Sequence, residues 1–191
     1  MNRFIYFSFF SLFSLLFCIT GCTPIKPSVT NQYTLTLSHP KSHRKSPMPY
    51  ALLLTKPEAM AGYRTEQMLY VKKHFSLTPF AKNAWSNPPA DMLYPLLVQR
   101  FQDSHAFRAI TSSPYADKTD YRLDTQLIAL HQNFLFKKSM LQLVAKITVT
   151  RISDNHVLAS RLIEQSIPCP SNTPYGGVVA ANQASSLFVE K

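Results

Sequence analysis

The chain has 191 residues, of which 46% are hydrophobic and 12% aromatic, and it contains only four glycines. This composition excludes a disordered or collagen-like chain and is sufficient for one domain with a hydrophobic core. The formal net charge of +10 favours a polyanionic partner, either a membrane with anionic lipids or a nucleic acid. A solvated basic surface without any partner explains the charge equally well.

The first element in the chain has the form of an export signal. Arg3 supplies a basic tip, residues 4–17 are apolar apart from Tyr and Ser, and Ile19-Thr20-Gly21-Cys22 closes the segment. These last four residues resemble the lipobox of bacterial lipoproteins, in which the Cys thiol is lipidated. A spanning helix is the alternative, but it needs about 20 apolar residues; an ordinary secretory signal is another. We therefore expect a lipoprotein signal peptide over residues 1–21 and lipidation, with palmitate-type acyl chains, at Cys22.

The next segments predict a tether followed by two strands. Residues 22–32 are polar with prolines and are expected to form a lipidated tether. Residues 33–37 alternate apolar and polar side chains, and residues 50–55 are apolar enough for a central strand. Between them, the basic loop from Lys41 to Lys45 is either a solvated loop, which we favour, or a surface that faces a membrane or partner.

The middle of the chain predicts one helix. Residues 68–73 and 74–79 are expected to be extended, and Asn87-Pro88-Pro89 opens a helix because proline is tolerated in the first turn. This helix should end near Ser104. It carries an apolar stripe formed by Leu93, Leu97 and Phe101, with Met92 and Leu96 beside it. Trp85, just before the helix, is expected in the core.

The remaining segments predict an antiparallel meander and a second helix. Residues 121–129 and 141–150 alternate apolar and polar side chains. Residues 153–156 form a turn, and residues 157–167 run back as the partner strand, so that short links join the strands. Residues 174–190 read as a helix with Val178, Ala181, Ala184 or Ser185, and Phe188 on one side. The expected fold is α+β: an antiparallel sheet with two main helices packed against it, as one domain over residues 33–191.

No motif in the sequence predicts catalysis, and we expect no enzyme and no cofactor. Asp103, Ser104 and His105 are the residue types of a catalytic triad, but adjacent residues on one turn cannot take its geometry. A helix end explains them better. Cys169 has no partner for an internal disulfide and is interpreted as an incidental thiol.

Two small clusters are candidate binding sites. His39 and His43 flank Pro40 in a basic loop, where nearby positive charge disfavours a metal ion, so no metal is expected. Gly176 and Gly177 precede a helix and could bind a lipid phosphate through backbone N–H groups. The favoured interpretation is that these glycines form the turn into the helix.

Four segments, in order, resemble the ABC-type transport auxiliary lipoprotein family. They are GYRT (62–65) with MLYV (68–71), NAWSNPPADML (83–93) with LL (96–97) and FRA (107–109), VLASR (157–161), and TPYGGVVAANQA (173–184). The resemblance extends from about Tyr33 to the end of the chain.

The resemblance implies a non-catalytic periplasmic subunit of an ABC lipid transport system of the MCE (mammalian cell entry) type. Its partners would be an MCE-type substrate-binding protein with its permease and ATPase, and a membrane through the lipid on Cys22, but no nucleic acid; a homo-oligomer is possible. Thr23 after the Cys resembles the signal for the periplasmic side of the outer membrane, with inner-membrane retention as the alternative. Two other functions stay open: an envelope assembly lipoprotein, or a stand-alone lipid carrier, which would need a large apolar cavity.

Overall fold

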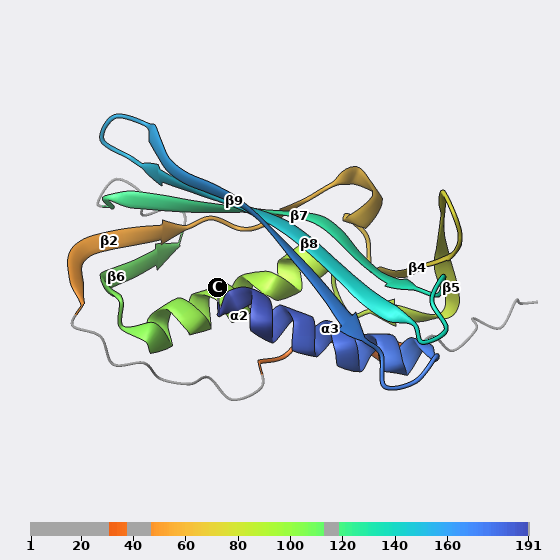
Figure 1. The fold of residues 1–191 in the computed structure, drawn as a ribbon. Coiled ribbons are helices and arrows are strands. Elements are labelled where there is room, and N and C mark those ends of the chain that lie inside the picture. Colours follow the sequence, from red (N-terminus) through yellow and green to blue (C-terminus); the bar gives the residue numbers. More distant parts are fainter. Residues whose placement is uncertain (1–30, 38–46, 113–118, 191) are drawn as a thin grey trace, which may run out of the picture.

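The computed structural model describes residues 31–37, 47–112 and 119–190, which form a twisted sheet with two helices on one face (Figure 1). Cys22, the expected signal peptide and the Lys41 to Lys45 loop lie outside these residues. The helices are α2 (Pro89–Ser104) and α3 (Pro174–Val189), with a short 3-10 turn, η2 (Ala61–Tyr63). The strands are β1 (Asn31–Tyr33), β2 (Met48–Leu54), β3 (Glu58–Ala59), β4 (Gln67–Lys73), β5 (Ser76–Trp85), β6 (Phe107–Ser112), β7 (Tyr121–Asn133), β8 (Met140–Arg151) and β9 (His156–Pro168).

The α+β class, with one domain and two main helices against a sheet, is confirmed. Strands β7, β8 and β9 form the expected antiparallel meander. The sheet as a whole is mixed rather than antiparallel, because β2, β3 and β4 each pair with β7 in parallel. Alternation of side chains fixes which face of a strand is buried, but it does not reveal which distant strand lies alongside.

The core lies between the two helices and the inner face of β7 and β8. The α2 stripe predicted from sequence is buried at Met92, Leu93, Leu96 and Leu97, with Phe101 packed beside it. On α3 the predicted apolar side is buried as well. Complete burial of one Leu or Phe side chain stabilises a fold by about 1.5–3 kcal/mol, so this contact holds the helices on the sheet.

The helix ends follow their sequence signals. Helix α2 starts with Pro89 in its first turn and ends at His105, whose positive φ of 48° reverses the chain. Helix α3 starts after Thr173, whose side-chain oxygen accepts a hydrogen bond from the Gly176 N–H at 3.1 Å. Trp85 is 3% exposed, as expected for a core residue.

The strand expected over residues 33–37 is wrong in its extent. Strand β1 ends at Tyr33, because the next backbone groups bond to a side chain of α3 instead of to a strand. The Asn182 amide donates to the Thr34 carbonyl at 3.2 Å and accepts from the Thr36 N–H at 2.7 Å. Leu35, between them, is still buried in the core.

Candidate interaction surfaces

Strand β9 forms a long free edge of the sheet. It runs for 13 residues and pairs with β8 on one side; on its other side it pairs with no strand in the described part of the chain. A free edge presents a row of unpaired N–H and C=O groups, to which an extended segment of another chain can add as a further strand.

The first half of this edge is exposed on both of its faces. Residues 156–162 are all exposed, and the arm made by this half of β9 and the end of β8 stands away from the helices at the upper left of Figure 1. Three large apolar side chains lie on it: Val157, Leu158 and Leu162, between 46% and 56% exposed. We call His156–Leu162 the β9 arm. It combines backbone edge groups with apolar side chains, which is the composition of a strand-addition site.

The turn at the tip of the arm is well ordered by polar contacts. Arg151 forms an ion pair with Asp154, with 2.7 Å between Nη2 and Oδ2, and this contact holds the pKa of the Asp154 carboxyl below its usual range. Asn155 has a φ of 54°, a left-handed conformation that Asn tolerates. The turn therefore fixes the register of the β8–β9 hairpin, including its uncovered half.

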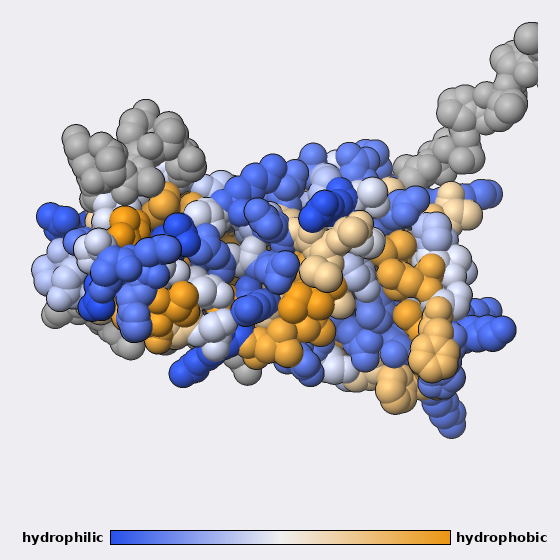
Figure 2. All heavy atoms as spheres, turned by 90° about the horizontal axis from the view of Figure 1, so that it is seen from above, coloured by the Kyte–Doolittle hydropathy of each residue, from blue (hydrophilic) through white to orange (hydrophobic). Residues whose placement is uncertain are grey.

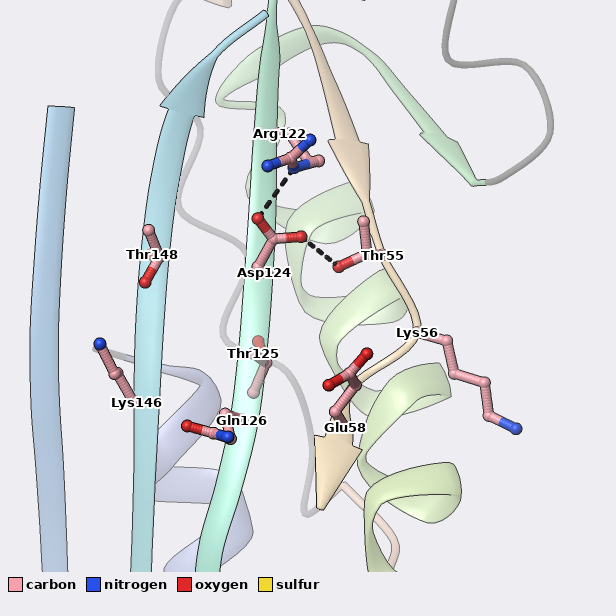
Figure 3. A pocket seen from close by; sticks show the side chains of 9 residues that line it. All are labelled: Thr55, Lys56, Glu58, Arg122, Asp124, Thr125, Gln126, Lys146 and Thr148. Carbon is pink, nitrogen blue, oxygen red and sulfur yellow. Dashed lines mark hydrogen bonds and ion pairs between the residues drawn. The ribbon is translucent and has the colours of Figure 1, made fainter. Parts of the chain in front are cut away.

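An open groove of about 470 Å³ lies on the sheet face opposite the helices (Figure 3). Its centre is Asp124 on β7, which forms an ion pair with Arg122 at 2.8 Å and accepts a hydrogen bond from the Thr55 hydroxyl at 2.9 Å. Lys56 turns away from the groove and pairs with Asp91 of α2 at 3.0 Å. The Asp124 carboxylate and the Arg122 guanidinium at its centre already pair with each other. The groove is therefore lined by polar groups and is not suited to binding an acyl chain.

Two further hollows lie beside Arg64 and Pro88. Their volumes are about 630 and 480 Å³, and both are open to solvent. The Arg64 guanidinium is held in place by a 2.9 Å hydrogen bond to the Ala59 carbonyl. None of these three hollows is the enclosed apolar chamber that a lipid carrier needs. From above, the sheet face shows apolar side chains in separate patches among hydrophilic ones (Figure 2).

A half-buried tyrosine–histidine pair lies close to the β4–β7 pairing. The Tyr63 hydroxyl and His131 Nδ1 are 2.9 Å apart, and the two rings stack. Burial lowers the pKa of His131, while a hydrogen bond with Gln142 acts in the opposite direction. Burial also raises the pKa of Tyr63. Both side chains therefore stay neutral near pH 7, and the pair ties η2 to the sheet.

The triad-like residues at the end of α2 form a helix end, as the sequence interpretation favoured. The Ser104 hydroxyl donates to the Phe101 carbonyl at 2.8 Å and accepts from the Ala106 N–H at 3.3 Å. His105 takes the left-handed conformation that ends the helix. The Ser104 hydroxyl is therefore engaged with backbone groups at the helix end.

Cys169 and the two glycines also have structural roles. Cys169 is completely buried, and burial raises the pKa of its thiol, so the reactive thiolate is disfavoured. Gly177 lies against the buried Gln132, where a Cβ would come within 2.5 Å of Oε1. The Gly176 N–H is used by the Thr173 cap. Both glycines lie inside the first turns of α3 rather than in a turn before it, and they permit the close approach of the helix to its neighbours.

Two negative findings apply to the described residues alone. Within residues 31–37, 47–112 and 119–190, no three His, Cys, Asp or Glu side chains gather where they could hold a metal ion. In the same ranges no helix is both long and apolar enough to cross a bilayer. His39 and His43 lie outside the described residues.

Comparison with known families decides the relationship of the chain. A family model described as the ABC-type transport auxiliary lipoprotein component matches residues 33–191. The chain belongs to this family. Membership makes it an auxiliary, envelope-associated lipoprotein component of an ABC-type transport system. A search of curated proteins found no match.

Solved structures share the fold of this auxiliary lipoprotein. A Xanthomonas campestris protein of the DUF330 family is 20% identical, with a TM-score of 0.75 over 83% of this chain and 90% of that one. An uncharacterized protein is 12% identical, with a TM-score of 0.67 over 85% and 95%. A hypothetical protein from Chlamydia trachomatis is 11% identical, with a TM-score of 0.52 over 75% and 95%. At these identities the likeness shows the fold alone.

Sequence reasoning missed the exposed apolar residues of this auxiliary lipoprotein. Val157, Leu158 and Ala159 were a usable signal, because three apolar residues in a row break the alternation of a strand with one buried face. In the structure Leu158 is an extra residue in the pairing, since Val157 lies opposite Thr150 and Ala159 opposite Val149. A second signal was the presence of aromatic residues next to lysines at the turns around Phe75 and Phe136.

Proposed function

We propose that this lipoprotein is a non-catalytic subunit of an MCE-type ABC lipid transport system and aids lipid transfer between the inner and outer membranes. Family membership supports the transport role. The MCE-type substrate-binding protein, with its permease and ATPase, is the partner that we propose.

The observation that carries the proposal is the uncovered β9 arm. It offers free backbone edge groups together with Val157, Leu158 and Leu162, all exposed. Side chains of this kind are costly to leave in water along a strand edge, where they promote unwanted pairing. A partner strand added at this edge would gain main-chain hydrogen bonds and apolar contacts at once. We therefore place the docking surface on the β9 arm.

The shape of the molecule favours docking over carriage. A carrier must shield acyl chains from water, whereas the groove around Asp124 and the two hollows beside Arg64 are open and partly polar. In our proposal the lipid passes through the partner, and this subunit fixes the position of that partner in the envelope.

We further propose that the chain is held on the periplasmic side of the outer membrane by lipid on Cys22. One acyl chain anchors a protein only marginally and two anchor it firmly, since each buried methylene contributes about 0.8 kcal/mol. Thr23 after the Cys favours the outer membrane over the inner one. The domain then stands on a short tether near the membrane surface.

The test is a crosslinked pull-down of the tagged lipoprotein from envelope membranes, read by mass spectrometry. Wild type should recover an MCE-type protein with its permease or ATPase. Leu162→Lys should lose most of this recovery, because charge on an edge strand opposes pairing. Val179→Lys is the matched control, since it changes an exposed apolar residue on α3.

The alternatives predict different results in the same pull-down. Recovery of unrelated outer-membrane proteins alone, with the MCE components present in the envelope, would refute the transporter role and favour an envelope assembly lipoprotein. Equal loss of recovery for both Lys variants would refute docking through the β9 arm.

A further inference from the structure

Two hairpin ends far apart in sequence lie side by side at one end of the sheet. Strand β4 pairs in parallel with β7, which places Val71 beside Asn133, and the Phe134 N–H donates to the Val71 carbonyl at 2.8 Å. The rings of Tyr70 and Phe134 also meet edge to face, with centroids 5.9 Å apart. The β4–β5 turn and the β7–β8 loop are therefore fixed relative to each other, on the right of Figure 1.

Both ends expose large apolar side chains. Phe75, at the β4–β5 turn, is fully exposed and has a φ of 63°, an unusual conformation for an aromatic residue. Leu77 follows it and is 42% exposed. On the β7–β8 loop, Leu135 and Phe136 are 38% and 57% exposed. We call these four residues the apolar tips. These side chains are not buried in the core, so core packing does not explain why they are apolar.

The apolar tips are bordered by positive charge. Lys72 and Lys73 precede Phe75, and Lys137 and Lys138 follow Phe136. Residues 67–90 and 125–153, which contain both hairpins, include no Asp or Glu. At this end of the molecule, on the right of Figure 2, apolar side chains lie next to hydrophilic ones that project outward. The charge complements an anionic surface.

We propose that the two hairpin ends form a peripheral membrane-contact site for a surface of anionic phospholipid. Aromatic and aliphatic side chains enter the headgroup region, where amphipathic interfaces hold them, and the lysines lie against the lipid phosphates. Projecting turn tips are too small for a stable protein interface, which buries about 1,200–2,000 Å². They suit a deformable lipid surface better.

The position of the first strand agrees with this site. The proposal rests here on the lipid anchor at Cys22 that forms part of the proposed function. Strand β1 is parallel to β5, with Asn31 beside Asn83, so the chain enters it from the side where β5 begins. The stretch of β5 from Ser76 to Asn83 is about 24 Å long. The chain from Cys22 to Asn31 can span at most about 30 Å. Its length therefore allows Cys22 to be anchored in the same membrane that the apolar tips contact.

The test uses the full lipoprotein reconstituted in vesicles, with a tryptophan as reporter. Trp85 is the single native Trp and is buried, so it supplies a constant background. In vesicles of phosphatidylglycerol and phosphatidylcholine, Phe75→Trp should shift its emission to shorter wavelength and be quenched several-fold by brominated lipid. Val157→Trp, on the β9 arm, is the matched exposed control and should keep its aqueous emission.

A variant without the four lysine charges distinguishes the contribution of the lysines to membrane binding from that of the apolar side chains. Replacement of Lys72, Lys73, Lys137 and Lys138 by Gln in the Phe75→Trp protein should remove most of the quenching, as should vesicles of phosphatidylcholine alone. Unchanged thermal unfolding of each variant confirms that the fold is intact. Aqueous emission from Phe75→Trp, or equal quenching of the Val157→Trp control, would overturn the membrane-contact site.

Failure of the anchor is distinguishable from failure of the site. If the protein does not float with the vesicles, lipidation of Cys22 is refuted. The quenching of Phe75→Trp, measured after vesicles are added to the protein in solution, then still tests whether the apolar tips contact lipid. A photo-crosslinker at position 75 that labels envelope proteins and no lipid would overturn lipid as the occupant in favour of a protein.

Discussion

The two halves of strand β9 lie in different environments, although both pair with β8. Near α3, Leu141, Leu143 and Ala145 on β8 are buried, and so is Ile167 on β9. Toward the hairpin turn, residues 156–162 of β9 are exposed on both faces. The half of β9 that belongs to the core is the half that packs against α3.

This difference separates stability from binding within a single hairpin. The covered half joins the helices to the sheet, while the β9 arm adds exposed apolar surface and free edge groups that contribute little to folding. Regions that bind partners are often drawn from such uncovered segments positioned by a rigid scaffold. Substitutions in the two halves should therefore have very different consequences.

The largest expected effect is a loss of stability in the covered half. Leu143→Ala removes a fully buried side chain and should lower the free energy of unfolding by about 2–5 kcal/mol, because it loses apolar burial and leaves a cavity. Leu162→Ala on the arm should change it by less than about 0.5 kcal/mol. Urea denaturation measures both. Similar losses in the two variants would contradict the division of the hairpin.

A smaller loss is expected where α3 meets β7. Gly177→Ala should lower stability by about 1–3 kcal/mol, because the new Cβ would crowd Gln132, which is held by a 2.9 Å hydrogen bond to Ser139. Gly62→Ala is the control, since its Cβ would meet only Leu77 at 4.0 Å. If Gly177→Ala and Gly62→Ala lower the unfolding temperature equally, the close approach of Gln132 does not explain the glycine at position 177.

The hydrogen bonds of Asn182, which take the place of strand pairing after Tyr33, should contribute less to stability than the close packing at Gly177. Asn182→Ala removes the hydrogen bonds to Thr34 and Thr36, at a cost of about 1 kcal/mol after the better helix propensity of Ala is included. Amide hydrogen exchange of Thr36 should accelerate. Gln183→Ala, at the exposed neighbouring position, should leave the exchange rate of Thr36 unchanged. Faster exchange in both variants would indicate that α3 as a whole is less stable.

The smallest expected effect is a pH dependence from His131. Its folded-state pKa lies below the unfolded value of about 6.5, so the unfolded chain binds the proton more readily. This contribution to stability is complete above that value and decreases as the pH falls toward the folded-state pKa. Urea midpoints between pH 7.5 and 5.5 should fall in wild type and fall less in His131→Gln. A parallel decline in both would assign the effect to other groups.

The sequence predicted the elements better than their arrangement. The stripe of α2, the apolar side of α3 and the alternation over residues 141–150 follow local periodicity, which the sequence carries directly. The parallel pairing of β4 with β7 joins distant segments and has no local signal. The early end of β1 depends on Asn182, a side chain that folding brings alongside.

The candidate surfaces were harder to predict than the core. Exposure of Leu162 depends on the absence of a covering helix, and the proximity of Phe75 to Phe136 depends on strand order. Neither property can be inferred from the spacing of residues along the chain. The favoured interpretation of Ser104 agrees with the structure because helix ends have local signatures. The role of Gly177 differs from the expected turn, because its contact with Gln132 forms only when α3 packs on the sheet.

The most direct test of the account is photo-crosslinking from position 162 in the envelope. A photoreactive residue at Leu162 should form a crosslink with the MCE-type partner, whereas the same residue at Val179 on α3 should not. Crosslinks from position 179 alone, or from neither position while the partner still copurifies, would contradict docking through the β9 arm.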